Sequence, residues 1–120
     1  MAKGSAVQIF GFKDCPGTRK AQRFFAERRI PVHFVDLAER PASAGELRRF
    51  QEKFGAGTLI DRDAKRFREL GLHVSGDSPE RLVARALVEP RLLRTPLVRS
   101  GSKIAIGHQP DEWHRWLAPA

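Results

Sequence analysis

The chain has 120 residues, enough for one domain that folds around its own hydrophobic core, which we expect to span 1–120. Its hydrophobic content of 41% and charged content of 30% are ordinary for a soluble globular protein, and no apolar stretch reaches the length of a membrane span. The formal net charge of +8 comes mostly from arginines mixed with glutamates along the expected helices, so we expect neither a specific nucleic-acid site nor a membrane contact.

The first expected segment is a strand–helix–strand unit over residues 7–36. Residues 7–12 form an apolar run typical of a strand, and residues 17–29 carry apolar side chains at helical spacing. Pro31 ends that helix, because proline cannot continue it, and an alternating run over residues 32–36 predicts a second strand. The short connection favours two parallel strands in a right-handed βαβ unit.

Residues 42–90 are expected to form a helical insertion. Ser43 is a cap residue for a helix that Gly55 ends. Asp61 is a plausible cap for a short second helix. Ser78-Pro79 predicts a third helix, because a cap residue is followed by proline at the first helical position.

Residues 96–117 are expected to return to β structure and then to end in a helix. Two short apolar runs flank a turn that contains Gly101, which predicts a β-hairpin. Gln109-Pro110 opens the last helix. The order β-α-β, helical insertion, β-β-α predicts an α/β protein with a thioredoxin/glutaredoxin-like four-stranded mixed sheet.

Cys15 is the only cysteine and lies where the loop after the first strand passes into the first helix. A thiol at a helix N-terminus faces unpaired backbone N–H groups and the positive end of the helix dipole, and both favour the thiolate. Arg19 lies one turn further on, with Lys13 and Lys20 nearby. We expect the sulfur to attack an electrophile or to bind beside an anion. The alternative is a small buried hydrophobe, the usual role of a lone cysteine.

The cysteine count also bears on the cellular compartment and on how an adduct on Cys15 is removed. A single cysteine cannot form an internal disulfide, which favours a reducing, cytoplasmic location and requires an external thiol to resolve any adduct on Cys15. Asp14 is interpreted as a loop residue whose charge opposes thiolate formation. The four histidines lack ligand spacing, so we expect no metal and no bound cofactor.

The string Cys15-Pro-Gly-Thr-Arg19-Lys-Ala after a first strand resembles the active-site loop of the glutaredoxin-linked arsenate reductase family. Residues 92–98 and the Gly-His-Gln-Pro segment that starts at Gly107 extend the resemblance over almost the whole chain. It implies a cysteine nucleophile that attacks arsenate, is capped by glutathione as co-substrate and is resolved by glutaredoxin or thioredoxin. We expect a monomer that acts on a small oxyanion or thiol substrate.

The resemblance also implies roles for particular residues. Cys15 takes the place of the nucleophile and Thr18 a hydroxyl position in the anion loop. Arg19 matches an arginine one turn into the first helix, and Lys103 falls near a basic position. Pro96 matches a proline that is usually cis and lies against the cysteine loop, where it shapes the site.

Two positions differ from the family pattern. Thr95 stands immediately before Pro96, where the reductases have arginine, and Arg94 comes one place earlier. Arg94 is a candidate anion ligand; alternatively, because a one-residue shift in a strand turns a side chain to the other face, it points away and leaves the anion to Arg19, Lys13 and the helix amides. Gly11 stands where the family has a histidine.

Three functions remain open from the sequence. The first is a thiol-dependent oxidoreductase of the arsenate reductase type, acting on arsenate or a related small oxidant. The second is a non-catalytic, redox-related regulator that binds RNA polymerase, although Thr18 replaces the second cysteine of a Cys-x-x-Cys switch. The third is glutaredoxin-like protein thiol exchange without arsenate activity.

Overall fold

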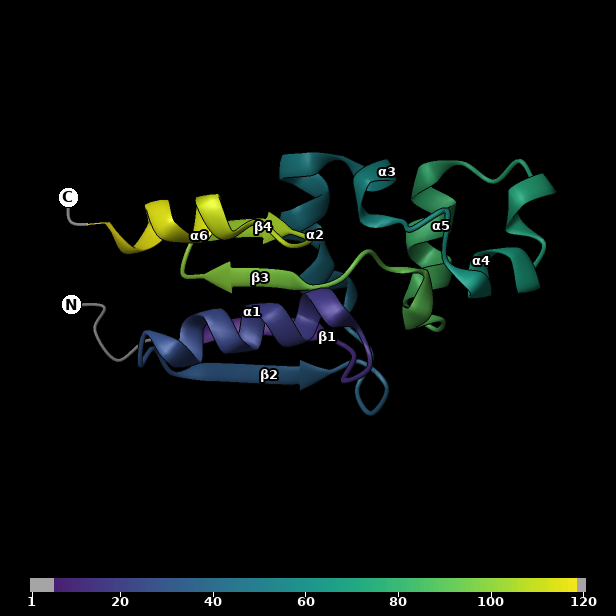
Figure 1. The fold of residues 1–120 in the computed structure, drawn as a ribbon. Helices are drawn as coiled ribbons and strands as arrows, with labels where there is room; N and C mark the ends of the chain where they lie inside the picture. Colours follow the sequence, from purple (N-terminus) through teal and green to yellow (C-terminus); the bar gives the residue numbers. More distant parts are fainter. Residues whose placement is uncertain (1–5, 119–120) are drawn as a thin grey trace. The chain divides into compact units, whose positions relative to one another are not determined.

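The computed structural model describes residues 6–118 and divides the chain into two compact units. The sheet unit contains the part up to Leu37 together with the part from Thr95 onward, and the helical unit is Ala38–Arg94 (Figure 1). Each unit is described by itself.

The sheet unit contains the four-stranded mixed sheet that the sequence predicts. Its four-stranded mixed sheet has the order β2-β1-β3-β4, with β1 parallel to β2 and antiparallel to β3, and β3 antiparallel to β4. The elements are β1 (Val7–Gly11), α1 (Pro16–Glu27), β2 (Val32–Asp36), β3 (Leu97–Ser100), β4 (Lys103–Ile106) and α6 (Pro110–Leu117). The expected α/β fold class is therefore confirmed.

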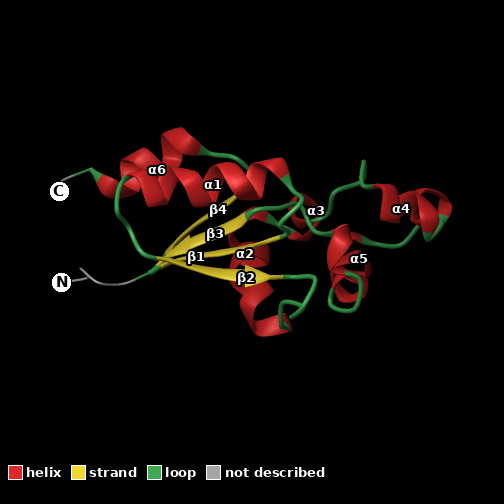
Figure 2. Ribbon diagram, turned by 60° about the horizontal axis from the view of Figure 1, so that its bottom comes forward, coloured by secondary structure: helices red, strands yellow, loops and turns green. Residues whose placement is uncertain are grey.

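One face of this sheet is covered by α1 and α6 (Figure 2). The buried core between them contains Ile9 and Val98 from the sheet, Phe25 from α1 and Trp113 from α6. The Phe25 and Trp113 ring centroids lie 5.5 Å apart. The apolar residues of α1 and α6 recur at helical spacing, so each of these helices buries one face against the sheet.

The register of the sheet places the ends of its strands. Phe10 pairs with Leu97, and Leu97 pairs with Ile106, at the end of the sheet where β1 leads into α1. Ser100 pairs with Lys103 at the hairpin turn, which is the opposite end. The turn contains Gly101 with φ of 63°, a conformation that glycine adopts without steric penalty.

The helical unit begins with a helix whose ends follow from its sequence. Ser43 and Glu46 form a reciprocal capping box at the start of α2 (Ala44–Phe54), and Gly55, with φ of 88°, ends it. Ser78 accepts the Arg81 N–H at the start of α5 (Pro79–Ala86), as its sequence predicts. The other helical segments are α3 (Ala56–Leu59), α4 (Lys65–Glu69), η1 (Leu72–Val74) and η2 (Pro90–Leu92).

The prediction that Asp61 caps a helix is wrong. The N-cap of α4 is Ala64, three residues later. The Asp61 carboxylate instead accepts the backbone N–H of Asp63 at 3.0 Å, and the Asp61 carbonyl accepts the N–H of Ala64 at 3.2 Å. This local turn uses the Asp61 side chain before the helix begins.

Within residues 6–118, none of the helices combines the length and the apolar character that crossing a bilayer requires.

Candidate functional site

Cys15 is the N-cap residue of α1 and is half-buried. Its backbone is extended, with φ of −85° and ψ of 118°, and its N–H donates to the Phe12 carbonyl at 3.0 Å. Pro16 occupies the first helical position, where a missing N–H leaves no bond unmade. The side chain of Cys15 makes no capping bond to the backbone, so its sulfur is available at the start of the helix.

A second segment reaches the sulfur from the loop that precedes β3. The Thr95 hydroxyl donates to Cys15 Sγ at 3.3 Å, and the thiol lies 3.9 Å from the Thr95 carbonyl oxygen. The Thr95–Pro96 peptide bond is cis, as the resemblance implied. The Gly107 N–H donates to the Pro96 carbonyl at 2.7 Å, which ties this loop to the end of β4. Residues 80 positions apart in the chain therefore meet at the sulfur.

The pKa of the Cys15 thiol lies below its ordinary value. Burial is the largest single influence and raises the pKa, but hydrogen-bond donors outweigh it: the hydroxyls of Thr18 and Thr95 and the backbone N–H groups of Thr18 and Gly17. All these donors are neutral. The side chains of Arg19 and Lys13 are not among the causes, so neutral dipoles at the helix start produce the shift.

Thr18 is fully buried, and its hydroxyl makes no hydrogen bond of normal geometry. The hydroxyl lies near the sulfur as a donor without a formed bond, and its proximity favours the charged form and lowers the pKa of Cys15. It can turn toward charge that develops on the sulfur or on a bound anion, since an unpaired buried donor gains most from such a partner.

Gly11 and Gly17 provide the space that this arrangement needs. A Cβ atom at Gly11 would lie 2.2 Å from the Thr18 hydroxyl oxygen, so the Thr18 side chain fills the space that a residue larger than glycine would enter. A Cβ atom at Gly17 would lie 3.1 Å from Pro96 Cδ and 3.7 Å from the Thr95 carbonyl oxygen. The close approach of the Thr95–Pro96 loop to α1 therefore depends on glycine at position 17.

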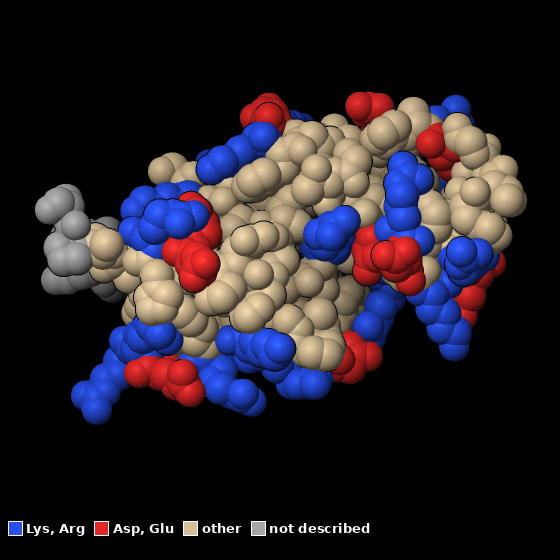
Figure 3. Space-filling model, turned by 45° about the horizontal axis from the view of Figure 1, so that its top comes forward, with Lys and Arg blue, Asp and Glu red and all other residues tan. Residues whose placement is uncertain are grey.

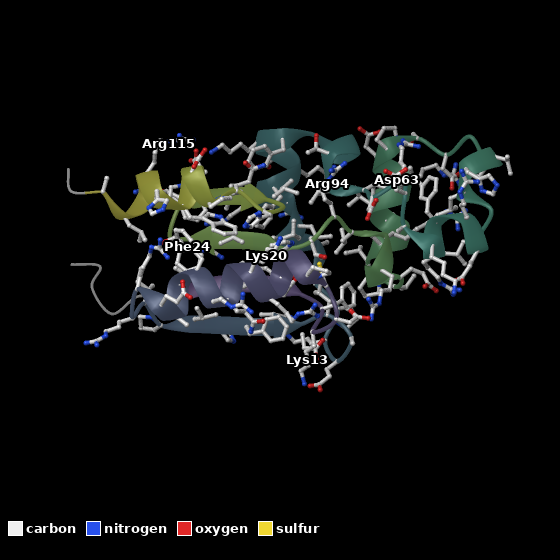
Figure 4. All side chains as sticks on the ribbon, in the orientation of Figure 1. Lys13, Lys20, Phe24, Asp63, Arg94 and Arg115 are labelled. Carbon is white, nitrogen blue, oxygen red and sulfur yellow. The ribbon has the colours of Figure 1, made fainter. Side chains whose placement is uncertain are left out.

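Two predicted anion ligands lie on the loop and first turns of α1. Arg19 Nη1 donates to the Lys13 carbonyl oxygen at 2.9 Å, which holds the guanidinium against the loop that carries Cys15. Lys13, whose position is labelled in Figure 4, has its ammonium 3.8 Å from an Asp36 carboxylate oxygen. Arg19 and Lys13 are thus joined to each other close to the nucleophile in sequence.

The structure does not bring Lys103 together with Cys15. Lys103 lies at the hairpin end of the sheet, and its ammonium donates to the Trp116 carbonyl at 3.5 Å. We therefore withdraw it from the candidate site. Arg94 (labelled in Figure 4) belongs to the helical unit, where its Nε donates to the Thr58 carbonyl at 3.1 Å.

The histidines show packing roles where contacts are defined. The His108 ring lies 5.5 Å from the Trp113 ring, and the His114 ring lies 5.0 Å from the Phe24 ring. Among residues 6–118, no group of three or more His, Cys, Asp and Glu side chains is placed to hold a metal ion.

Thr95 contacts the sulfur of Cys15, and sequence reasoning did not predict this contact. Its sequence position showed only that it replaces an arginine, and nothing local indicated that its hydroxyl contacts the sulfur. A threonine directly before the cis proline, in a fold where that proline lies against the cysteine loop, was the available signal.

Together, the fold and the site define a thioredoxin-fold protein with one thiol at the start of its first helix. The ArsC family model matches residues 10–116, and the chain therefore belongs to the ArsC family.

The chain is also similar to curated relatives and, in its fold, to solved structures. The chain is 26% identical over 113 residues to "Global transcriptional regulator Spx 2" of Oceanobacillus iheyensis, which covers 92% of this chain and 83% of that protein. Its fold is similar to that of the YffB protein, with a TM-score of 0.84, 23% identity and coverage of 94% and 100% of the two chains. For an arsenate reductase from Vibrio cholerae, the TM-score is 0.79, the identity 22% and the coverage 94% and 98%.

Proposed function

We propose that this protein is a thiol-dependent oxidoreductase in which Cys15 is the nucleophile. The observation that carries the proposal is the setting of the sulfur: it belongs to the N-cap residue of α1, accepts the Thr95 hydroxyl at 3.3 Å and has a lowered pKa. These features favour the thiolate, which is the reactive form. Membership in the ArsC family supports the same chemistry. We place the protein in the reducing cytoplasm, where a lone thiol stays reduced.

The proposed oxidant is arsenate or a related small oxidant, with glutathione as co-substrate. The Cys15 thiolate displaces one arsenate oxygen, which leaves as water after protonation. Attack by a glutathione thiolate on the Cys15 sulfur then returns an electron pair to arsenic, which is reduced from As(V) to As(III) and leaves as arsenite. The products are one water, one arsenite and a Cys15–glutathione disulfide, and glutaredoxin reduces that disulfide.

The residues at the start of α1 are assigned to holding the oxyanion. Backbone N–H groups of Gly17 and Thr18 point toward the sulfur, where an attacked oxyanion must lie. The Thr18 hydroxyl is an unused buried donor, and Arg19 offers a guanidinium fork beside the loop. Together these groups compensate the negative charge of the oxyanion, which the neutral Thr95 side chain does not.

The first test measures the rate of Cys15 alkylation against pH, with and without arsenate, and then glutathione-coupled turnover. We expect an alkylation midpoint below that of an ordinary cysteine, protection by arsenate, and turnover that Cys15→Ser abolishes without unfolding the protein. Turnover retained by Cys15→Ser would refute the nucleophile. A midpoint at or above the ordinary value would return Cys15 to a packing role.

Glutaredoxin-like thiol exchange is a second candidate, favoured by Thr95. The donors that lower the pKa of Cys15 are neutral, which suits a disulfide as well as it suits an oxyanion. Exchange without arsenate chemistry would give a Cys15–glutathione disulfide that glutaredoxin removes, and no arsenate turnover.

A regulator that binds RNA polymerase is the third candidate. The relative named as a global transcriptional regulator supports this class of function. Thr18 replaces the second cysteine of a disulfide switch, so binding would not depend on an internal disulfide. Binding to RNA polymerase that Cys15→Ser retains, in the absence of any turnover, would favour this candidate over both enzymes.

A further inference from the structure

Three cations form a stripe along the exposed side of α1. Arg19, Lys20 and Arg23 are all exposed, and helical spacing places them on one side, opposite the buried Ala21 and Phe25. Lys20 is labelled on α1 in Figure 4. The stripe begins one turn after Cys15 and runs about 6 Å along the helix axis. We call these three residues the α1 cationic stripe.

The charge of the stripe is not neutralised by nearby carboxylates. Arg19 donates to a neutral carbonyl, and within residues 6–118 neither Lys20 nor Arg23 makes an ion pair. Glu27, in the last turn, is the sole carboxylate of α1. Basic and acidic side chains both occur on the face drawn in Figure 3. In the helical unit, Arg66 pairs with Glu89 and Arg85 with Asp77.

Neither the stability of α1 nor the lowered pKa of Cys15 accounts for cations at these positions. The N-terminal part of a helix carries the positive end of its dipole, so a cation at Arg19 does not stabilise α1, and its first turn has no acidic residue. The causes that lower the pKa of Cys15 are hydrogen bonds from neutral donors, and none of them comes from the stripe. The charge of the stripe is therefore available to another molecule.

We propose that the α1 cationic stripe docks the acidic surface of the thiol protein that regenerates Cys15. This inference rests on the proposed function, because it assigns the partner of the same sulfur. In the regenerating step, the partner's thiolate attacks the glutathione sulfur of the Cys15–glutathione disulfide, and Cys15 leaves as thiolate. The partner is left with a disulfide to glutathione, which its own second thiol or another glutathione then reduces.

The chemistry of the site favours an acidic protein over a nucleic acid. Cys15 has no second cysteine in the chain to resolve its adduct, so a molecule that carries a thiol must come to this end of α1. The three cations lie on the helix that begins at Cys15, and they match acidic side chains around the partner's cysteine. Charge of this kind acts mainly on the rate of encounter, which it raises at low ionic strength.

The test uses the full chain with glutathione on Cys15 and follows release of glutathione. The probes are a glutaredoxin with Asp and Glu around its active cysteine, the same glutaredoxin with those residues changed to Asn and Gln, and dithiothreitol. The stripe variant is Lys20→Glu with Arg23→Glu. The matched control is Arg48→Glu with Arg49→Glu, two exposed helical arginines of the helical unit that change the net charge equally.

We expect the stripe variant to react roughly tenfold more slowly with the acidic glutaredoxin at low salt and to lose the salt dependence of the wild-type rate. For the control variant with the acidic glutaredoxin, the logarithm of the rate should fall by less than half as much. The same limit should hold for the stripe variant with the neutralised glutaredoxin. Dithiothreitol should release glutathione equally from all variants, which shows that the thiol chemistry is intact.

Three results would overturn the docking proposal. One is an unchanged rate of the stripe variant with the acidic glutaredoxin. Another is an equal loss of rate with both glutaredoxins. The third is binding of duplex DNA or RNA that the stripe variant loses while its rate with glutaredoxin is unchanged. If Cys15 does not accept glutathione at all, the proposed function fails and the docking proposal fails with it.

Discussion

Thr95 supplies a hydroxyl donor to Cys15 Sγ at 3.3 Å, although it stands where the reductases resembled by this chain have an arginine. Threonine in place of arginine at position 95 replaces a fixed positive charge with a neutral dipole. A neutral donor still favours the thiolate, because it makes a hydrogen bond to the charged sulfur. Arsenate, which carries negative charge itself, receives less compensation from this position.

The change Thr95→Val tests that role. Loss of the hydroxyl should raise the pKa of Cys15 and slow its alkylation at pH 7 roughly tenfold, since hydrogen bonds to charged groups are the strong ones. Thr95→Ser keeps the donor and should react at nearly the wild-type rate. The readout is alkylation rate against pH, and identical profiles for Val and Ser would exclude the hydroxyl.

Gly17→Ala tests the close approach of the two segments. The added methyl group would lie 3.1 Å from Pro96 Cδ, so the Thr95–Pro96 loop must move outward by a few tenths of an ångström. That movement should weaken the bond from Thr95 to the sulfur and raise the pKa of Cys15, with a roughly threefold slower alkylation at pH 7. Gly45→Ala, where the nearest atom is 3.9 Å away, is the control.

At the scale of elements, the capping box at the start of α2 is the clearest local determinant. Ser43 accepts the Glu46 N–H at 3.1 Å, and the Glu46 carboxylate accepts the Ser43 N–H at 2.9 Å. Glu46 also accepts two bonds from the Arg40 guanidinium, at 2.9 and 3.2 Å. Arg40 is the main reason that the pKa of Glu46 lies below its ordinary value.

Ser43→Ala should lower the free energy of unfolding by about 1 kcal/mol, the usual effect of removing such a cap. Ser43→Asp keeps an acceptor at the N-cap and should recover most of it. Chemical denaturation of the whole chain measures both variants. A Ser43→Ala protein as stable as the wild type would show that α2 does not depend on its cap.

The sequence predicted the elements that depend on local signals, including α1, α5 and the β3–β4 hairpin. It failed at Asp61, where a turn used the carboxylate that was expected to cap a helix. It also failed at Lys103, although the neighbouring turn already indicated that this residue lies at the hairpin end. The position of Cys15 at the start of a helix could be predicted from the sequence. Its contact with Thr95 could not, because that contact depends on tertiary structure.

For the whole molecule, the acidic groups with a lowered pKa titrate in two separate pH ranges. The carboxyls of Glu46, Asp77 and Glu89 all have lowered pKa values, chiefly through hydrogen bonds from Arg40, Arg85 and Arg66 respectively, and all three lie in the helical unit. Cys15, in the sheet unit, also has a lowered pKa, but its ordinary range is near or above pH 8.

These shifts give two separate effects on stability. A lowered carboxyl pKa stabilises the folded state above the ordinary value of that group, and the stabilisation is lost as pH falls through the folded pKa. The helical unit should therefore lose stability below about pH 4.5. The Cys15 contribution is complete only above its unfolded pKa and declines as pH falls toward its folded pKa.

Unfolding measured against pH checks both effects. Cys15→Ser should match the acid limb of the wild type, fall below it as pH rises through the lowered pKa of Cys15, and reach its full difference above the ordinary thiol pKa of about 8.5. Glu89→Gln should flatten the acid limb without changing the alkaline one. A difference between wild type and Cys15→Ser that appears only in acid would contradict the assignment.

The space shared by Gly11 and Thr18 couples the residues that these two positions can hold. A side chain at position 11 would overlap the side chain of Thr18, which is fully buried. A histidine at position 11 therefore requires the Thr18 side chain to move or to be replaced by a smaller one. A Gly11→His variant that restores the reductase pattern at this position needs a second change at position 18.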